Sequence, residues 1–180
     1  MENKILFYDT ETTGLDQPWI VQLAWQCYDA KDGLVTEGDV IIKPDGYEIP
    51  PEATAIHGIS HEHALEVGMQ LKDAMSLFRE SWKACDHIVG HNLQFDLKAL
   101  AFSIRSLGMS VVTDGKKLTC TMEKTTHLLK LPGKYGYKWA KLEELHRFLF
   151  KNDFDGAHNA MADVRATSKC YFELKKRGLL

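Results

Sequence analysis

The chain has 180 residues, of which 44% are hydrophobic and 26% charged, and its formal net charge is −3, as is typical of a soluble globular domain. No apolar stretch approaches the roughly 20 residues that a membrane-spanning helix needs, and the first residues lack the form of a signal peptide. We therefore expect one domain over residues 1–180, located in the cytoplasm without membrane contact, with its four scattered cysteines reduced.

Charge is divided unevenly along the chain. Residues 1–100 hold 7 Lys/Arg and 17 Asp/Glu, whereas residues 101–180 hold 15 and 8. The acidic part suits cations and the basic part suits phosphates, although solvated surfaces also acquire such a bias by chance. The division is compatible with a polyanionic substrate and does not by itself establish one.

The first predicted strand leads directly into two acids. Residues 5–8 are apolar or aromatic, which predicts a buried strand, and Asp9 and Glu11 follow. Because the acids are two positions apart, an extended backbone points both side chains the same way. Neighbouring carboxylates repel unless a proton or a cation lies between them, and a hard divalent cation suits oxygen ligands. The alternative is an acidic strand end that only leads into a turn.

The remaining elements begin with strands and then become mostly helical. Three more strands are predicted at residues 19–28, 34–42 and 87–90. Apolar residues at three- and four-residue steps predict helices from about residue 68 and over residues 94–107, 119–129, 140–150 and 158–176. Short turns join the first three strands into an antiparallel meander. The order indicates an α/β fold with a mixed central sheet flanked by helices.

Two later segments carry further acids and histidines. Asp96 lies near the start of a predicted helix, where an acid also has a purely structural role beside free N–H groups. His158 precedes Asp163 by five residues, which is about 140° on an ideal helix. The two side chains can therefore converge only if His158 lies on the loop or first turn that enters the helix.

Taken in order, these segments resemble the DEDDh-type 3′→5′ exonucleases, the family that contains the epsilon proofreading subunit of bacterial DNA polymerase III. Its first motif, Asp-x-Glu-Thr-Thr-Gly-Leu, matches residues 9–15, and its second, His-Asn-x-x-Phe-Asp, matches residues 91–96. The third motif matches His158 and Asp163. The resemblance covers nearly the whole chain and implies a ribonuclease H-like fold, with a five-stranded mixed sheet and helices on both sides.

The resemblance also implies catalytic roles. Asp9 would bridge two Mg²⁺ ions, Glu11 and Asp163 would help to hold one side, and Asp96 would support the other. Mn²⁺ is expected to substitute, because both ions accept hard oxygen ligands. The imidazole of His158 would take the proton from the attacking water. Phosphodiester hydrolysis suits such a site, since two cations about 3.5–4 Å apart stabilise both the attacking and the leaving oxygen.

The implied substrate is a nucleic acid with a free 3′ end, most simply single-stranded DNA. Residues 51–59 resemble the substrate-contacting loop of the family. The expected contacts with the substrate come from Thr10, Glu11, Thr12, Leu15, Glu52, His57, His91, Asn92, Phe95 and His158. Glu52 and His57 are alternatively an ordinary loop acid and loop histidine, and Phe95 is a core residue as readily as a contact.

Residues 130–139 form a predicted loop that is rich in lysine, glycine and aromatic residues. One hypothesis is that Lys134 and Lys138 contact backbone phosphates while a neighbouring aromatic ring stacks on a base. The alternative is a surface loop in which Trp139 covers the core.

The sequence favours a metal-dependent 3′→5′ exonuclease that releases nucleoside 5′-monophosphates. An RNA-trimming exoribonuclease is the alternative within this class, because recognition of the 2′-OH depends on local pocket geometry. A non-catalytic nucleic-acid-binding module of a polymerase is the alternative outside it, although all five expected catalytic side chains are present. Membership of a polymerase or DNA-repair complex and a free-standing trimming role are both compatible with these residues.

Overall fold

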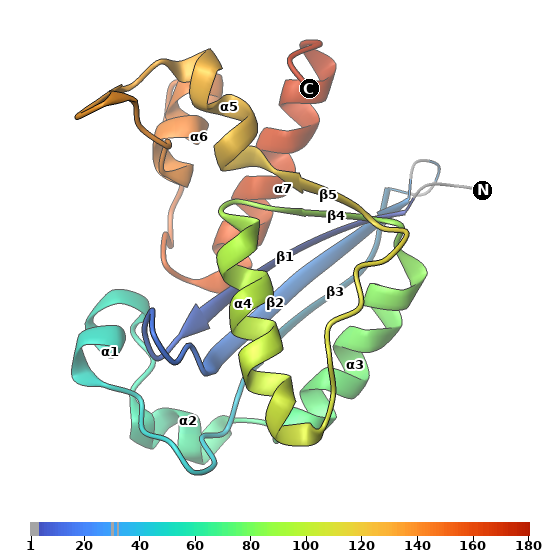
Figure 1. Cartoon of the computed structure of the whole chain (residues 1–180), viewed down its shortest axis with the longest axis vertical. Helices are drawn as coiled ribbons and strands as arrows, with labels where there is room; N and C mark the ends of the chain where they lie inside the picture. The colour runs from blue at the N-terminus through green and yellow to red at the C-terminus, as the bar shows by residue number, and fades with distance from the viewer. Residues whose placement is uncertain (1–3, 30, 32) are drawn as a thin grey trace.

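The computed structural model describes residues 4–29, 31 and 33–180. Its centre is a five-stranded sheet with the strand order β3-β2-β1-β4-β5 (Figure 1). The strands are β1 (Ile5–Thr12), β2 (Ile20–Asp29), β3 (Gly33–Ile41), β4 (His87–Gly90) and β5 (Lys117–Cys120). The first three strands form an antiparallel meander, and β4 and β5 run parallel to β1. The sheet is therefore mixed, as the sequence predicted.

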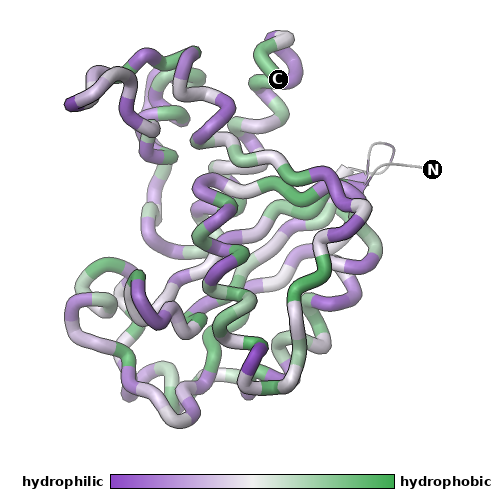
Figure 2. The backbone as a smooth tube through the Cα atoms, viewed as in Figure 1, coloured by the Kyte–Doolittle hydropathy of each residue, from purple (hydrophilic) through white to green (hydrophobic). Residues whose placement is uncertain are grey.

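The central strand is apolar on both faces, which is why it lies in the middle of the sheet. Leu6 and Tyr8 point into the larger core, whereas Phe7 points into a second core on the opposite face. All four residues of β4 are buried, whereas β3, at the edge, is mostly exposed. Figure 2 shows apolar residues along the strands at the centre of the molecule.

Helices cover both faces of the sheet (Figure 1). On one face, α3 (Leu71–Ala84) and α4 (Leu93–Ile104) pack against the larger core, and a 3₁₀ turn continues α4 over Arg105–Leu107. On the other face lies α7 (Ala160–Lys176), with α5 (Thr121–Leu129) and α6 (Leu142–Phe150) packed beside it. Among the described residues, no helix has the length and apolar character that crossing a membrane requires.

The segment after β3 is helical, although the family resemblance implied a loop over residues 51–59. It contains α1 (Pro51–His57) and α2 (His61–Val67). Proline is tolerated in the first turn of α1, where no intrahelical N–H is needed. Gly58, in the left-handed conformation at φ 77°, ends this helix. The residues predicted to meet substrate there, Glu52 and His57, therefore lie on a helix.

Two further segments differ from the prediction. The pattern near residues 119–129 was predicted as helix alone, but the fifth strand, β5, includes its first two residues. The predicted loop at 130–139 contains a hairpin of β6 (Pro132–Gly133) and β7 (Gly136–Tyr137). Trp139 is 63% exposed, so the alternative in which it covers the core is wrong.

Candidate active site

Asp9 and Glu11 lie within β1, near its C-terminal end, on the face of the sheet that α7 covers. The strand continues through both acids because each is paired with β2, Asp9 opposite Ala24 and Glu11 opposite Gln22. Both side chains point the same way, as their two-residue spacing predicted. Glu11 is only 9% exposed, so its carboxylate is largely removed from water.

The first turn of α7 brings a third carboxylate to this place. Asn159 caps the helix by accepting a hydrogen bond from the Ala162 N–H at 3.2 Å, and Asp163 follows within the same turn. Carboxylate oxygens of Asp9, Glu11 and Asp163 all lie within 4.8 Å of one another. Carboxylates this close repel unless protons or a cation lie between them.

Asp96 approaches from α4, on the opposite face of the sheet, and is 3% exposed. Its Oδ1 accepts hydrogen bonds from the backbone N–H of Thr10 at 3.0 Å and from the Thr10 hydroxyl at 2.8 Å. Both hydrogen bonds fall on the same oxygen, so Oδ2 is the atom with which Asp96 would contact a cation. Asp96 is outside the group of three within 4.8 Å, but it lines the same cleft.

A cleft of about 290 Å³ opens over these acids. Its lining comprises Asp9, Thr10, Glu11, His91, Asn92, Phe95, Asp96, Lys141, Leu142, Glu143, Phe154, Ala157, His158 and Asp163. All five residues predicted to be catalytic are therefore brought together at one place. Three remote parts of the chain meet there, from β1, from α4 and from the segment that enters α7.

Burial raises the pKa of every carboxylate predicted to bind metal. Burial, strengthened by the charges of Asp163 and Asp96, raises the pKa of Glu11 to about 8. Burial also raises the pKa of Asp96 to about 7, against the hydrogen bonds from Thr10, and the pKa of Asp163 to about 6. The pKa of Asp9 is raised well above its usual range by burial and by the neighbouring acids. At neutral pH the cleft is therefore suited to hold protons or a cation.

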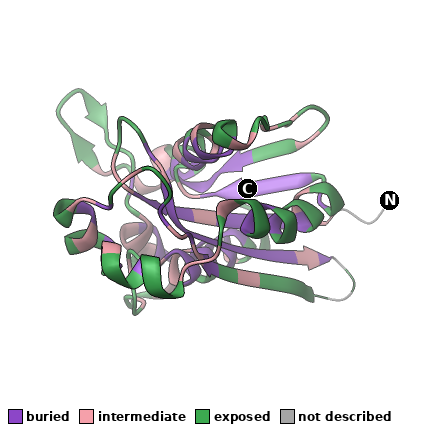
Figure 3. Cartoon of the chain, turned by 90° about the horizontal axis from the view of Figure 1, so that it is seen from below, coloured by how far each residue is buried: buried purple, intermediate pink, exposed green. Residues whose placement is uncertain are grey.

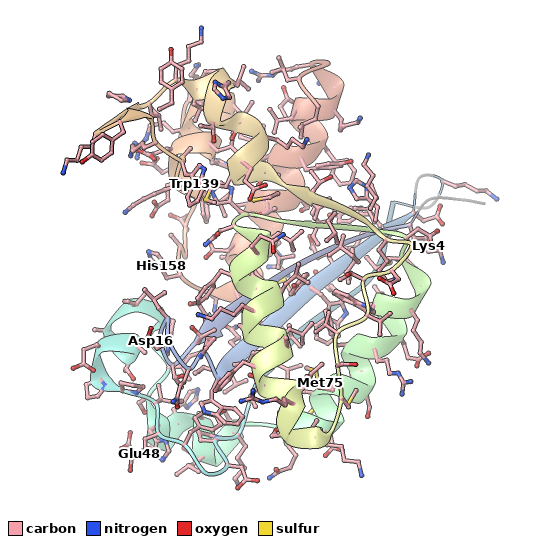
Figure 4. The ribbon with its side chains drawn as sticks, in the orientation of Figure 1. Lys4, Asp16, Glu48, Met75, Trp139 and His158 are labelled. Atoms are coloured by element: carbon pink, nitrogen blue, oxygen red, sulfur yellow. The ribbon has the colours of Figure 1, made fainter. Side chains whose placement is uncertain are left out.

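His158 lies on the turn immediately before α7, with the left-handed φ of 65°. Its backbone N–H donates a hydrogen bond of 3.1 Å to Oδ2 of Asp163, and its side chain is exposed in the lining of the cleft. In Figure 4 the labelled His158 lies at the side of the molecule, on the segment that leads into α7. This is the position that the five-residue spacing required for His158 and Asp163 to converge.

The ring of His91 is held by the protein on both of its nitrogens. Nε2 donates to the carbonyl of Ala140 at 2.9 Å, and Nδ1 lies 2.9 Å from the hydroxyl of Thr121. Burial lowers the pKa of His91 to about 4, so the ring is neutral. His91 therefore fixes the segment before α6 to the start of α5, and its contact with substrate stays a prediction.

The other residues predicted to bind substrate are divided between the cleft and its surroundings. Thr10, Asn92 and Phe95 line the cleft. The four that do not belong to its lining are Thr12, Leu15, Glu52 and His57. Leu15 is 73% exposed beyond β1, and Lys98 donates to its carbonyl at 2.6 Å. Their contacts with a terminal nucleotide stay predictions.

The sequence did not reveal three polar residues at the site. Gln22 is 3% exposed on β2, and its Oε1 accepts a hydrogen bond of 3.1 Å from the backbone N–H of Ala160, the first residue of α7. Lys141 and Glu143 line the cleft at the start of α6. The only signal for Gln22 was an amide within a mostly apolar strand, a signal that Gln26 shares, and nothing in the spacing marked the other two.

The fold and the carboxylate cluster define a nuclease, and comparison with known proteins identifies its family. Residues 6–171 match the model of the RNase_T exonuclease family, so the chain belongs to this family. It is a DEDDh-type exonuclease of the ribonuclease H-like superfamily, in agreement with the sequence motifs. An uncharacterised exonuclease, CP81 of Escherichia phage 186, is 29% identical over 196 residues that cover 99% of this chain and 91% of that protein.

Solved structures of Exonuclease I show the same fold. The enzyme from Methylocaldum szegediense matches with a TM-score of 0.78 and 22% identity, over 97% of this chain and 41% of its own. E. coli Exonuclease I in complex with a dA16 oligonucleotide matches with a TM-score of 0.76 and 22% identity, over 99% and 42%. This chain thus spans about four tenths of the length of the solved enzymes that it matches.

Proposed function

We propose that this protein is a metal-dependent 3′→5′ exonuclease that degrades single-stranded DNA and releases nucleoside 5′-monophosphates. The observation that carries the proposal is the cluster of Asp9, Glu11 and Asp163 oxygens within 4.8 Å, in a cleft of an exonuclease fold. Single-stranded DNA is supported as substrate by the complexes of E. coli Exonuclease I with dA16 and dT13 oligonucleotides.

The carboxylates of the cleft fit two hard divalent cations, because they offer only oxygen ligands and repel one another without a cation. Asp9, Glu11 and Asp163 would hold the ions from the α7 side, and Asp96 would contribute Oδ2 from the α4 side. Mg²⁺ is the ion that such ligands favour, and Mn²⁺ substitutes. When bound, the ions activate the attacking water and stabilise charge on the attacking and leaving oxygens.

His158 is the proton acceptor of the proposed reaction. Its exposed imidazole takes a proton from the water and can pass it to solvent, because the turn before α7 places the ring in the lining of the cleft. The hydrogen bond from its backbone N–H to Asp163 holds this turn against the carboxylate cluster. The proposed proton acceptor and one of the proposed metal-binding acids, Asp163, are thereby fixed to the same helix start.

Apolar contacts position the 3′-terminal nucleotide without reading its base. The ring of Phe95 lies in the cleft lining and is half-buried, so one part of it remains available for stacking. Leu15 is the most exposed apolar side chain beside β1 and can lie against a neighbouring base. Stacking of this kind tolerates any sequence, because every base has a π face.

Digestion of one oligonucleotide labelled at either end tests the proposal. With Mg²⁺, 5′-labelled dT20 should give a ladder of shortening products, while 3′-labelled dT20 should release its label at once as a mononucleotide. EDTA should stop both reactions. Early release of a 5′ label, or internal fragments from both substrates, would contradict the assignment. A matched RNA strand degraded faster than the DNA would replace it with the exoribonuclease alternative.

A further inference from the structure

The β6–β7 hairpin carries aromatic side chains that are exposed to solvent. Gly133 pairs with Gly136, so Lys134 and Tyr135 form the two-residue tip, with the Lys134 ammonium 5.1 Å from the centre of the Tyr135 ring. Tyr135 is 91% exposed and Trp139, at the base of the hairpin, is 63% exposed. Figure 3 shows the hairpin projecting from the body with its residues exposed. Large aromatic side chains this exposed on a projecting hairpin indicate a binding surface.

The base of the hairpin is fastened to the cleft. The carbonyl of Ala140 accepts the hydrogen bond from His91, and the next residue, Lys141, lines the cleft. Glu144 of α6 accepts from the Lys138 ammonium at 2.6 Å and from the Lys141 backbone N–H at 2.8 Å. Figure 4 places the labelled Trp139 on the same side of the molecule as His158. The base of the hairpin is therefore held beside the cleft.

The charge of this segment complements a nucleic-acid strand. Residues 130–141 contain four lysines and no aspartate or glutamate. The segment is therefore basic, whereas the neighbouring cleft is lined by several acids. Lys138 forms an ion pair with Glu144 at 2.6 Å, so its contact with phosphate stays a prediction. Lys134 at the tip and Lys141 at the cleft are the two cations that we assign to phosphates.

We infer that the β6–β7 hairpin is an arm that binds the substrate strand on the 5′ side of the bond being cut, with Tyr135 and Trp139 stacking on bases and Lys134 contacting phosphate. This inference rests on the proposed exonuclease function. Aromatic side chains interleaved with cations recognise single strands, because unpaired bases are free to stack. Binding away from the scissile bond would lower KM for long strands and leave chemistry at the carboxylates unaltered.

Kinetics with a long and a minimal substrate test the arm. The variants are the double substitution Tyr135→Ala with Trp139→Ala, and Lys134→Ala. The matched controls are Leu77→Ala and Lys83→Ala, both exposed on α3 outside the cleft. The substrates are dT20 and the p-nitrophenyl ester of thymidine 5′-monophosphate, which fills the cleft and is too short to reach the hairpin tip. The dissociation constant for fluorescein-labelled dT20 is measured in EDTA over a range of salt.

The double variant should raise KM and the dissociation constant for dT20 by about 10-fold or more, in keeping with loss of stacked bases. Its kcat for dT20 and its turnover of the ester should stay within about 2-fold of the wild type, as should all values for the controls. Lys134→Ala should reduce the salt slope of binding by about 0.7, the value for one phosphate contact on a single strand.

Three results would overturn the inference. The hairpin variants bind dT20 as tightly as the wild type, the control variants lose as much affinity for dT20 as the hairpin variants do, or the double variant loses as much activity on the ester as on dT20. If the wild type hydrolyses neither substrate, the proposed function fails instead. Binding in EDTA does not require catalysis, so it still decides whether the hairpin holds a single strand.

Discussion

The backbone N–H of Ala160 donates a hydrogen bond of 3.1 Å to the side chain of Gln22. Gln22 lies directly opposite Glu11 in the register of β1 and β2, and Ala160 begins the helix that carries Asp163. One amide side chain of β2, the strand that pairs with the strand of Glu11, thus contacts the start of the helix that carries Asp163. The relative position of the two carboxylates depends on this contact as well as on the core beneath it.

Gln22→Ala should therefore reduce both stability and activity. Leaving the buried Ala160 N–H without its acceptor costs roughly 1–3 kcal/mol, and a shift of about 1 Å between catalytic groups can cost about 100-fold in kcat. Thermal unfolding and single-strand digestion measure the two effects. Gln26→Ala is the matched control, because Gln26 accepts from Ser168 farther along α7. It should lose stability but keep kcat, and a similar kcat for both variants would contradict the role of Gln22.

Asp9→Asn and Asp163→Asn should each abolish Mg²⁺-dependent cleavage. The amide keeps the shape of the side chain but removes the charge that a cation requires. In EDTA, each variant should unfold at the same temperature as the wild type or higher, since one repulsion among buried carboxylates is gone. Cleavage and thermal unfolding are measured on the same purified protein. Metal-dependent activity in either variant would remove that residue from the site.

His158→Asn should lower kcat by about 10²–10⁴-fold, the usual loss for a positioned general base. Asparagine is chosen because position 158 has a φ of 65°, a conformation that asparagine tolerates better than alanine. Stability should therefore change little, which circular dichroism during heating would verify. His63→Asn, at an exposed histidine outside the cleft, is the control and should keep full activity. Equal rates for the two variants would exclude His158 as the base.

Stability without metal should fall as pH rises from about 6.5, the pKa of an unfolded histidine, to about 8.5. Below this range the pKa values of the buried His87 and His91, lowered to about 4, oppose the fall. Burial raises the pKa of Glu11 to about 8 and the pKa of Asp163 to about 6, whereas unfolded carboxylates titrate near pH 4. In this window the folded protein binds more protons than the unfolded chain, so raising the pH favours unfolding. The unfolding temperature in EDTA should drop by roughly 2–4 °C for each kcal/mol lost.

Two comparisons test this pH dependence. Mg²⁺ should restore the unfolding temperature most strongly at high pH, where the carboxylates are charged and bind the cation. Glu11→Gln should flatten the fall in EDTA, because it removes the group whose pKa reaches about 8. An unfolding temperature in EDTA that rises across this window would contradict the burial of charged acids at the cleft.

Much of the fold follows from local periodicity, since β1, α3 and α7 bury long regular stripes of apolar residues. The strand β5 was not located because it has only four residues and two are exposed, so neither alternation nor an apolar run marks it. The hairpin strands have two residues each, which is too short for any period to be visible. In these segments the structure depends on pairing with distant residues rather than on local sequence.

At the site, too, the features set by local sequence could be predicted, whereas contacts between distant parts of the chain could not. The shared direction of Asp9 and Glu11 follows from the period of a strand, but only the family resemblance indicated which remote acids would join them. Gln22 could not be identified as a link to α7, because its partner is a backbone N–H that is 138 residues away. The sequence also could not predict that Trp139 is exposed, because an aromatic residue in a glycine-rich segment can lie in a core or on a binding surface.

The central claim is that Asp9, Glu11 and Asp163, with Asp96, form one divalent-metal site. Crystals grown with Mn²⁺ and measured at the manganese absorption edge test it most directly, because anomalous scattering locates the ion itself. We expect an anomalous peak between the carboxylates of β1 and α7 that is absent from crystals of Asp9→Asn. Saturating Mn²⁺ that leaves this position without anomalous density in the wild-type crystal would contradict it.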